Sequence, residues 1–115
     1  MDRKDITLLV YPVKGLAQAR AFFNELLGVK PYFDQPFYVG YRVGEQEIGL
    51  DPNAGSAGHS EPVGYWRVED IRTSLQSLLE AGGQTEQEVR NVGDGKLTAL
   101  VREPGGSLVG LMQLP

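Results

Sequence analysis

Nucleophilic and acid–base residues are scarce in this chain of 115 residues. It contains no cysteine and a single histidine, so the sequence supports neither a Cys–His pair nor a Ser–His–Asp arrangement. His59 lies in the segment 51–62, DPNAGSAGHSEP, whose Gly, Ser, Pro and Asn content predicts an exposed loop. We therefore expect a solvent-exposed histidine rather than a ligand or a base.

Glu47 is the carboxylate with the clearest potential for ligand binding. Alternation along a strand places it on the same face as Gly49, toward a predicted concavity. There it would pair with a basic group or with a cationic ligand. Of the other paired carboxylates, Glu45, Glu86 and Glu88 are expected to be solvated, and Asp70 is expected to cap a helix.

Two further candidates for ligand contacts are Tyr65 and Arg67. They share strand parity with Val63 and are expected to face the same concavity. There Tyr65 would stack on a ligand, and Arg67 would hold an anionic or carbonyl group. A surface or dimer-interface role is the alternative. Trp66 has the opposite parity and is expected to pack on a helix. The apolar residues predicted to share the concave face are Leu8, Val10, Leu108 and Met112, which would line a small-molecule pocket or pack on a partner sheet.

Four aromatic residues cluster between positions 33 and 41 and are candidates for an aromatic wall: Phe33, Phe37, Tyr38 and Tyr41. The segment 34–36, DQP, blurs the strand register, so alternation assigns them no face. Tyr38 and Tyr41 are included among the expected ligand contacts.

The elements that must position these residues occur in the same order twice. Apolar strand-like runs and two helical stretches predict strand, helix and three strands, then the same set again. Segments 13–28 and 68–83 have equal lengths and end in Gly28 and Gly83. The runs Ile48-Gly49-Leu50 and Val109-Gly110-Leu111 match in the same way. The expected strands are 6–13, 29–34, 37–43, 47–50, 63–68, 88–92, 98–102 and 108–113.

We therefore predict one α+β domain, 1–115, built from two βαβββ modules that form a curved mixed sheet with helices outside and a concave ligand cavity. The modules are expected at 5–51 and 63–115, with a linker at 52–62. Gly28 is expected to end the first helix in the left-handed conformation, and Gly82-Gly83 to end the second. A module of about 50 residues can hardly bury its own sheet face, which favours pairing of the two.

Composition argues against several classes of partner. Net charge is −4, with no basic run, which disfavours binding to nucleic acid or to an anionic membrane surface. No apolar run approaches the ~20 residues of a membrane span. The N-terminal residues lack the apolar region of a signal peptide, and a cytoplasmic location is expected.

Three motifs resemble the vicinal oxygen chelate superfamily, which includes glyoxalase I, extradiol dioxygenases and bleomycin-resistance proteins. Residues 21–28, AFFNELLG, resemble the helix end F-Y-x-x-x-L-G of that family. Residues 65–71, YWRVEDI, resemble the start of its second module, and residues 102–111, REPGGSLVGL, resemble its D-P-x-G-N turn and final strand. The resemblance covers nearly the whole chain and implies a homodimer.

The resemblance also implies where a divalent metal would be held. The positions that correspond to the His, Glu and Gln ligands of the family's enzymes are Leu8, Gly49, Val63 and Gly110, none of which has a donor side chain. No metal or other cofactor is therefore expected. The two glycines are instead expected to leave room for a ligand.

The leading functional hypothesis is metal-independent binding of a small, partly apolar or aromatic molecule, with drug or toxin sequestration as its most concrete form. One alternative is a metal-dependent lyase, isomerase or dioxygenase of the glyoxalase type. Another is a non-catalytic interaction domain with a vestigial pocket.

Overall fold

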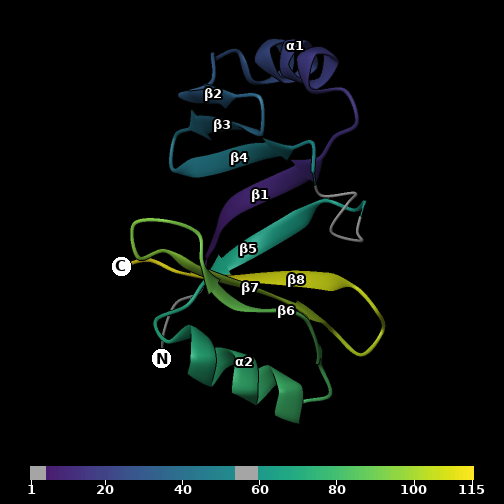
Figure 1. Cartoon of the computed structure of the whole chain (residues 1–115), viewed down its shortest axis with the longest axis vertical. Helices are drawn as coiled ribbons and strands as arrows, with labels where there is room; N and C mark the ends of the chain where they lie inside the picture. The colour runs from purple at the N-terminus through teal and green to yellow at the C-terminus, as the bar shows by residue number, and fades with distance from the viewer. Residues whose placement is uncertain (1–4, 54–59) are drawn as a thin grey trace. The chain divides into compact units, whose positions relative to one another are not determined.

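The computed structural model describes residues 5–53 and 60–115. His59 and most of the predicted linker lie outside these residues. The chain divides into two compact units, Thr7–Val63 and Gly64–Pro115, the second joined by the N-terminal residues up to Ile6. Each contains one helix and the greater part of four strands (Figure 1).

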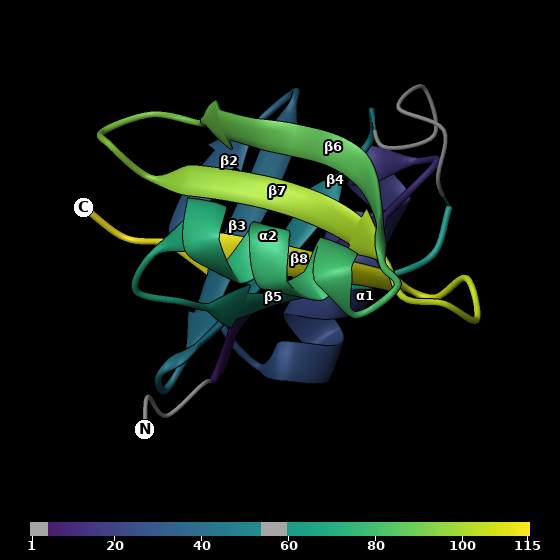
Figure 2. The same cartoon turned by 90° about the horizontal axis from the view of Figure 1, so that it is seen from below.

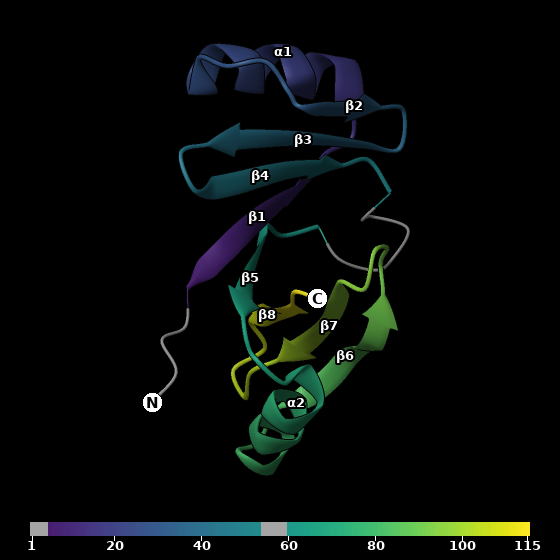
Figure 3. The same cartoon turned by 90° about the vertical axis from the view of Figure 1, so that its left-hand side faces the viewer.

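The first module follows the predicted order of strand, helix and three strands. Its elements are β1 (Ile6–Pro12), α1 (Leu16–Leu27), β2 (Phe33–Gln35), β3 (Tyr38–Val43) and β4 (Gln46–Asp51). The strands are ordered β2-β3-β4-β1, with β1 parallel to β4 and the other pairs antiparallel. A tight turn joins β3 to β4 (Figure 3), and Gly44 adopts a φ of 61° in it.

The second module repeats this plan. Its elements are β5 (Val63–Arg67), α2 (Ile71–Glu80), β6 (Gln84–Asn91), β7 (Leu97–Arg102) and β8 (Leu108–Gln113). The order is β5-β8-β7-β6, with β5 parallel to β8. The helix α2 covers one face of these strands (Figure 2). The predicted α+β class with two βαβββ modules is confirmed.

The helix ends follow local chemistry. Gly28 ends α1 with a φ of 69°, as predicted, and its N–H donates to the carbonyl of Asn24. Asp70 caps α2 as predicted, because its carboxylate accepts a hydrogen bond from the N–H of Thr73 at 3.2 Å. At the end of α2 it is Gly82 that has a positive φ, of 105°. Gly28 was expected to correspond to Gly83, so the left-handed glycine of the second module lies one residue earlier than expected.

Each module has its own apolar core between helix and sheet. In the first module the buried residues are Val39, Tyr41, Ile48 and Leu50, packed against side chains of α1. In the second they are Val68, Ile71, Leu75, Ala99, Val101 and Leu111. These cores identify the helix-facing side of each sheet, and strand alternation then assigns the opposite side.

Two strand predictions need correction. The strand expected at 29–34 is reduced to β2, because Pro31 lacks an N–H for the ladder. The strand expected at 88–92 is β6, which begins four residues earlier, at Gln84, and pairs with β7 through register shifts. Within the described residues, neither helix is long and apolar enough to cross a membrane.

Candidate functional site

The site is built on the sheet of the first module, on the side opposite α1, which we call the open face. Register places Glu47 between Leu8 on β1 and Arg42 on β3. It places Gly49 between Val10 and Gly40 in the same way. Because neighbouring residues of β3 and β4 form the helix-facing core, these side chains belong to the open face.

Gly40 and Gly49, which pair across β3 and β4, are each covered by a tyrosine. A Cβ built on Gly49 would lie 1.8 Å from the hydroxyl oxygen of Tyr38, and one built on Gly40 would lie 3.3 Å from the ring and hydroxyl of Tyr32. Both phenols are therefore brought to one glycine pair. The expectation that Gly49 leaves its space open for a ligand is wrong, because Tyr38 fills that space.

Tyr32, Arg42 and Glu47 form an aromatic and ionic cluster beside this glycine pair. The Tyr32 hydroxyl donates a short hydrogen bond to Oε1 of Glu47. Nη2 of Arg42 lies 3.6 Å from the same oxygen. The Arg42 guanidinium carbon lies 4.7 Å from the centroid of the Tyr32 ring, within the range of a cation–π contact. Glu47 thus pairs with a basic group, one of the two roles expected for it.

The environment of Tyr32 keeps its phenol protonated. Burial, the hydrogen bond to Glu47 and the charge of Glu47 together raise the pKa of Tyr32 to about 12, against an opposing effect of Arg42. The phenol is therefore a hydrogen-bond donor to Glu47 at neutral pH, and it holds the carboxylate in place on the sheet.

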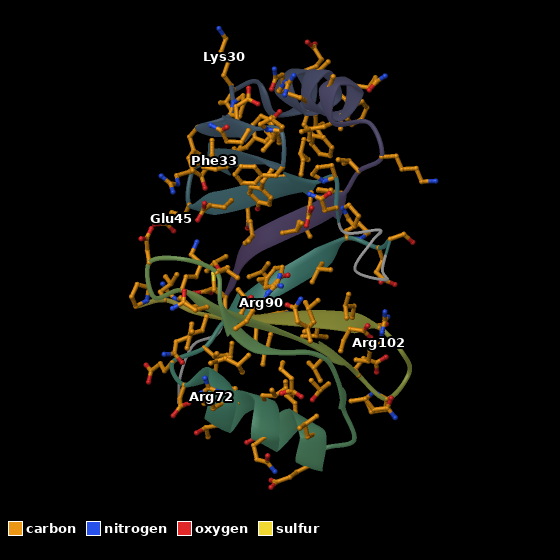
Figure 4. The ribbon with its side chains drawn as sticks, in the orientation of Figure 1. Lys30, Phe33, Glu45, Arg72, Arg90 and Arg102 are labelled. Carbon is orange, nitrogen blue, oxygen red and sulfur yellow. The ribbon has the colours of Figure 1, made fainter. Side chains whose placement is uncertain are left out.

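An aromatic wall of Phe33, Phe37 and Tyr38 borders the same surface. Phe33 pairs with Gly40 and so faces the open side of β2 (labelled in Figure 4). Its ring centroid lies 5.9 Å from that of Phe37 and 6.2 Å from that of Tyr38. The register thus assigns Phe33 and Tyr38 the facing that the sequence left open.

Tyr41 does not belong to this surface, and its assignment as a ligand contact is wrong. It lies on the helix-facing side of β3 with none of its surface exposed. Its hydroxyl donates to Oδ1 of Asn24 at 2.6 Å and also lies 3.2 Å from the carbonyl oxygen of Arg20. Tyr41 therefore has a structural role between β3 and α1.

The second module places its predicted contacts on one face as well. Tyr65 pairs with Gly110 and Arg67 pairs with Met112, on the side opposite the core. The Tyr65 ring covers Gly110, since a built Cβ there would lie 2.6 Å from it. The expected gap at Gly110 is therefore also filled by a tyrosine.

Trp66 has the predicted parity but a different environment. It pairs with Leu111 on the helix-facing side, yet it is 38% exposed and outside the buried core. Trp66 therefore lies on the predicted face but is not a buried core residue.

The sequence model of the Glyoxalase/Bleomycin resistance protein/Dioxygenase superfamily matches residues 6–111 of this chain. The chain belongs to this superfamily. Its repeated modules, and the parallel pairs Val10–Gly49 and Tyr65–Gly110 at equivalent places in them, agree with that membership. No curated protein matches the chain in sequence.

Solved structures share the fold of this superfamily member at low sequence identity. A hypothetical protein from Bacillus halodurans C-125 has a TM-score of 0.76 and 17% identity, with 99% of this chain and 96% of that chain covered. A glyoxalase/bleomycin resistance protein/dioxygenase superfamily member from Vibrio splendidus 12B01 has a TM-score of 0.72 and 18% identity, with 96% and 97% covered. A methylmalonyl-CoA epimerase from Streptomyces coelicolor, in complex with 2-nitronate-propionyl-CoA, has a TM-score of 0.68 and 11% identity, with 94% and 95% covered.

The residues of this chain do not fit the divalent metal that the sequence resemblance implied. The four positions that the resemblance assigned to metal ligands hold Leu8, Gly49, Val63 and Gly110, whose side chains have no oxygen, nitrogen or sulfur donor. Across residues 5–53 and 60–115, no three His, Cys, Asp or Glu side chains are grouped to hold a metal ion. Glu47, the carboxylate on the open face, is engaged by Tyr32 and Arg42.

Tyr32 and Arg42 are the site residues that sequence reasoning missed. Arg42 had a usable signal, because a two-residue turn at Gly44-Glu45 pairs residue 42 with Glu47. Tyr32 precedes β2 and lies outside every strand, and its backbone N–H donates to the carbonyl of Gly40 at 2.9 Å. No periodic pattern includes it.

Proposed function

We propose that this superfamily member binds a small organic molecule with an aromatic or apolar part, on the open face of the first module and without a metal ion. The observation that carries the proposal is the exposed aromatic surface next to an ion pair. Tyr32, Phe33 and Phe37 are 39–58% exposed. Exposed aromatic groups beside a few convergent polar groups are typical of small-molecule sites.

The aromatic wall supplies the attraction for such a ligand. An aromatic ring that packs against another at 4.5–7 Å gains about 0.5–1.5 kcal/mol beyond the area it buries. Phe33 and Phe37 are already held at such a separation, so less conformational freedom is lost on binding. Membership of a superfamily named in part for bleomycin resistance makes sequestration of a drug or toxin the concrete form of the proposal.

Metal independence is proposed because Leu8, Gly49, Val63 and Gly110 have no side-chain atom that could ligate a metal. Since the four positions carry no donor, binding would be driven by stacking, apolar contact and the charge of Glu47. A homodimer and a cytoplasmic location are further parts of the proposal. Light scattering after gel filtration tests the first, and cell fractionation tests the second.

Thermal unfolding in the presence of aromatic compounds tests the function. We expect planar aromatic compounds, bleomycin-type drugs among them, to raise the Tm equally with and without EDTA. The double variant Phe33→Ala/Phe37→Ala is expected to lose most of that rise, whereas Arg72→Gln on α2 (Figure 4), in the other module, is expected to keep it.

Three results would contradict the proposal. Stoichiometric metal in the purified protein, with ligand binding lost on chelation, would favour a metal-dependent enzyme. No Tm change across a broad library would favour a domain that acts through protein contacts. Ligand binding that survives loss of both phenylalanines would remove the aromatic wall from the site.

A further inference from the structure

The ion pair between Arg42 and Glu47 has one fixed and one loosely held member. The Glu47 side chain is 28% exposed and accepts a hydrogen bond from Tyr32. The Arg42 side chain is 59% exposed and lies 3.6 Å from Glu47, longer than a hydrogen bond between charged groups. Exposed ion pairs contribute only about 0–1 kcal/mol, so little free energy holds Arg42 in this position.

The place that the Arg42 guanidinium occupies has the chemistry of an organic-cation site. One side is the ring of Tyr32, 4.7 Å from the guanidinium carbon, and the other is the carboxylate of Glu47. An aromatic face combined with a negative charge is how proteins recognise ammonium and guanidinium groups. The guanidinium of Arg42 therefore shows which kind of group this position accepts.

We propose that Glu47 and the Tyr32 ring form a binding site for the cationic group of a ligand, an amidinium, guanidinium or alkylammonium, and that Arg42 occupies this site until a ligand displaces it. The inference rests on the proposed function and specifies its ligand as an aromatic cation. Phe33 pairs with Gly40, the residue that Tyr32 covers, so the aromatic wall begins beside the cation site.

The geometry favours a cation over an anion. An anion bound to Arg42 would lie close to the carboxylate of Glu47, which Tyr32 holds in place, and the two negative charges would repel each other. The phenol of Tyr32 is already donated to Glu47 and offers an anion no further proton. A ligand cation meets neither obstacle, because it replaces a charge of the same sign.

Calorimetric titration with benzamidine tests the site, with benzoate and benzamide as the anionic and neutral probes of the same ring. We expect wild type to bind benzamidine more tightly than either. Arg42→Gln is expected to tighten benzamidine binding about two- to fivefold, because the competing cation is removed. Glu47→Gln is expected to weaken it at least about tenfold, because a charge-assisted contact is lost.

Variants of Tyr32 separate the ring from the hydroxyl and guard against a folding defect. Tyr32→Phe keeps the face for the cation and is expected to weaken benzamidine binding less than Tyr32→Leu does. Arg72→Gln on α2 is the matched charge control and is expected to bind as wild type does. Each variant is compared at a temperature at which its circular dichroism spectrum matches that of wild type.

Several outcomes would overturn the inference. Weaker benzamidine binding in Arg42→Gln, no effect of Glu47→Gln, or tighter binding of benzoate than of benzamidine would each do so. If neutral aromatic compounds bind through Phe33 and Phe37 while benzamidine ignores Glu47, the proposed function stands and this inference fails. If neither wild type nor Arg42→Gln binds any aromatic probe, both fail.

Discussion

The hydroxyl of Tyr38 lies in the space that a side chain at Gly49 would need, 1.8 Å from a Cβ built there. In the second module Tyr65 covers Gly110 at the equivalent position, but from a different strand. Tyr38 reaches its glycine from β3, whereas Tyr65 reaches Gly110 from β5. Both modules thus fill, with a tyrosine, the space at a glycine that the sequence resemblance assigned to a metal-ligand position.

Replacement of Gly49 by alanine is expected to destabilise the protein through contact with Tyr38. Overpacking of this kind costs about 1–3 kcal/mol in the free energy of unfolding, measured by urea titration. In the background Tyr38→Ala the same replacement should cost much less, so a double-mutant cycle should show strong coupling. Additive effects would mean that Tyr38 does not occupy this space.

Gly64→Ala is the control for this prediction. Gly64 also lies in a strand, but a Cβ there would meet Ile6 at 3.6 Å, an ordinary contact distance. Because glycine is unfavourable in a strand by about 0.5–1 kcal/mol relative to alanine, this replacement should be neutral or stabilising.

Tyr41→Phe is expected to destabilise the first module without changing ligand binding. The variant removes the hydroxyl that donates to Asn24, a part-buried amide on α1. A buried polar group left without its partner costs about 1–3 kcal/mol. A loss of ligand affinity in Tyr41→Phe, at a temperature at which the variant is folded, would show that Tyr41 contributes to ligand binding after all.

Much of the fold could be predicted from the sequence because its signals are local. Apolar periodicity identified both helices and most strands, and chemistry at single residues identified the caps at Gly28 and Asp70. The repeated motifs around Gly49 and Gly110 indicated which strands of the two modules are equivalent, and the parallel strand pairs of each module agree with that assignment. Alternation also put Glu47 on the open face correctly.

The site could be predicted only in part, because its remaining contacts depend on long side chains that reach across strands. Tyr38 fills the space at Gly49 from the neighbouring strand, which alternation along β4 cannot indicate. Tyr41 is only three residues from Tyr38, yet the odd spacing puts it on the opposite face of β3. The facing of these residues became clear only with the pairing of β2 and β3.

Asp70→Ala is expected to lower the Tm by removing the cap of α2. The hydrogen bond from the N–H of Thr73 holds the pKa of Asp70 below its usual value. A lowered pKa in the folded state adds stability above the unfolded-state pKa, and that stability is lost as the pH falls through the folded-state value. The Tm difference between wild type and Asp70→Ala should therefore shrink in acid. A difference that stays constant down to pH 2 would argue against the ionised cap.

Tyr32 should add a dependence of stability on alkaline pH. Its pKa is raised by burial and by Glu47 to about 12, from 10.0. A folded-state pKa above the unfolded-state value gives stability that is complete below about pH 10 and is lost as the pH rises through about 12. Absorbance of tyrosinate between pH 9 and 13 should show a phenol that ionises near pH 12 and is missing in Tyr32→Phe. Burial also raises the pKa of Tyr41, and the late ionisation of Tyr41 should remain in that variant. In Glu47→Gln the Tyr32 phenol should ionise at lower pH than in wild type, although still above 10 because burial is unchanged. An unaltered titration in Glu47→Gln would mean that the Tyr32–Glu47 hydrogen bond does not form in solution, and the fixed carboxylate on which the cation site depends would be lost with it.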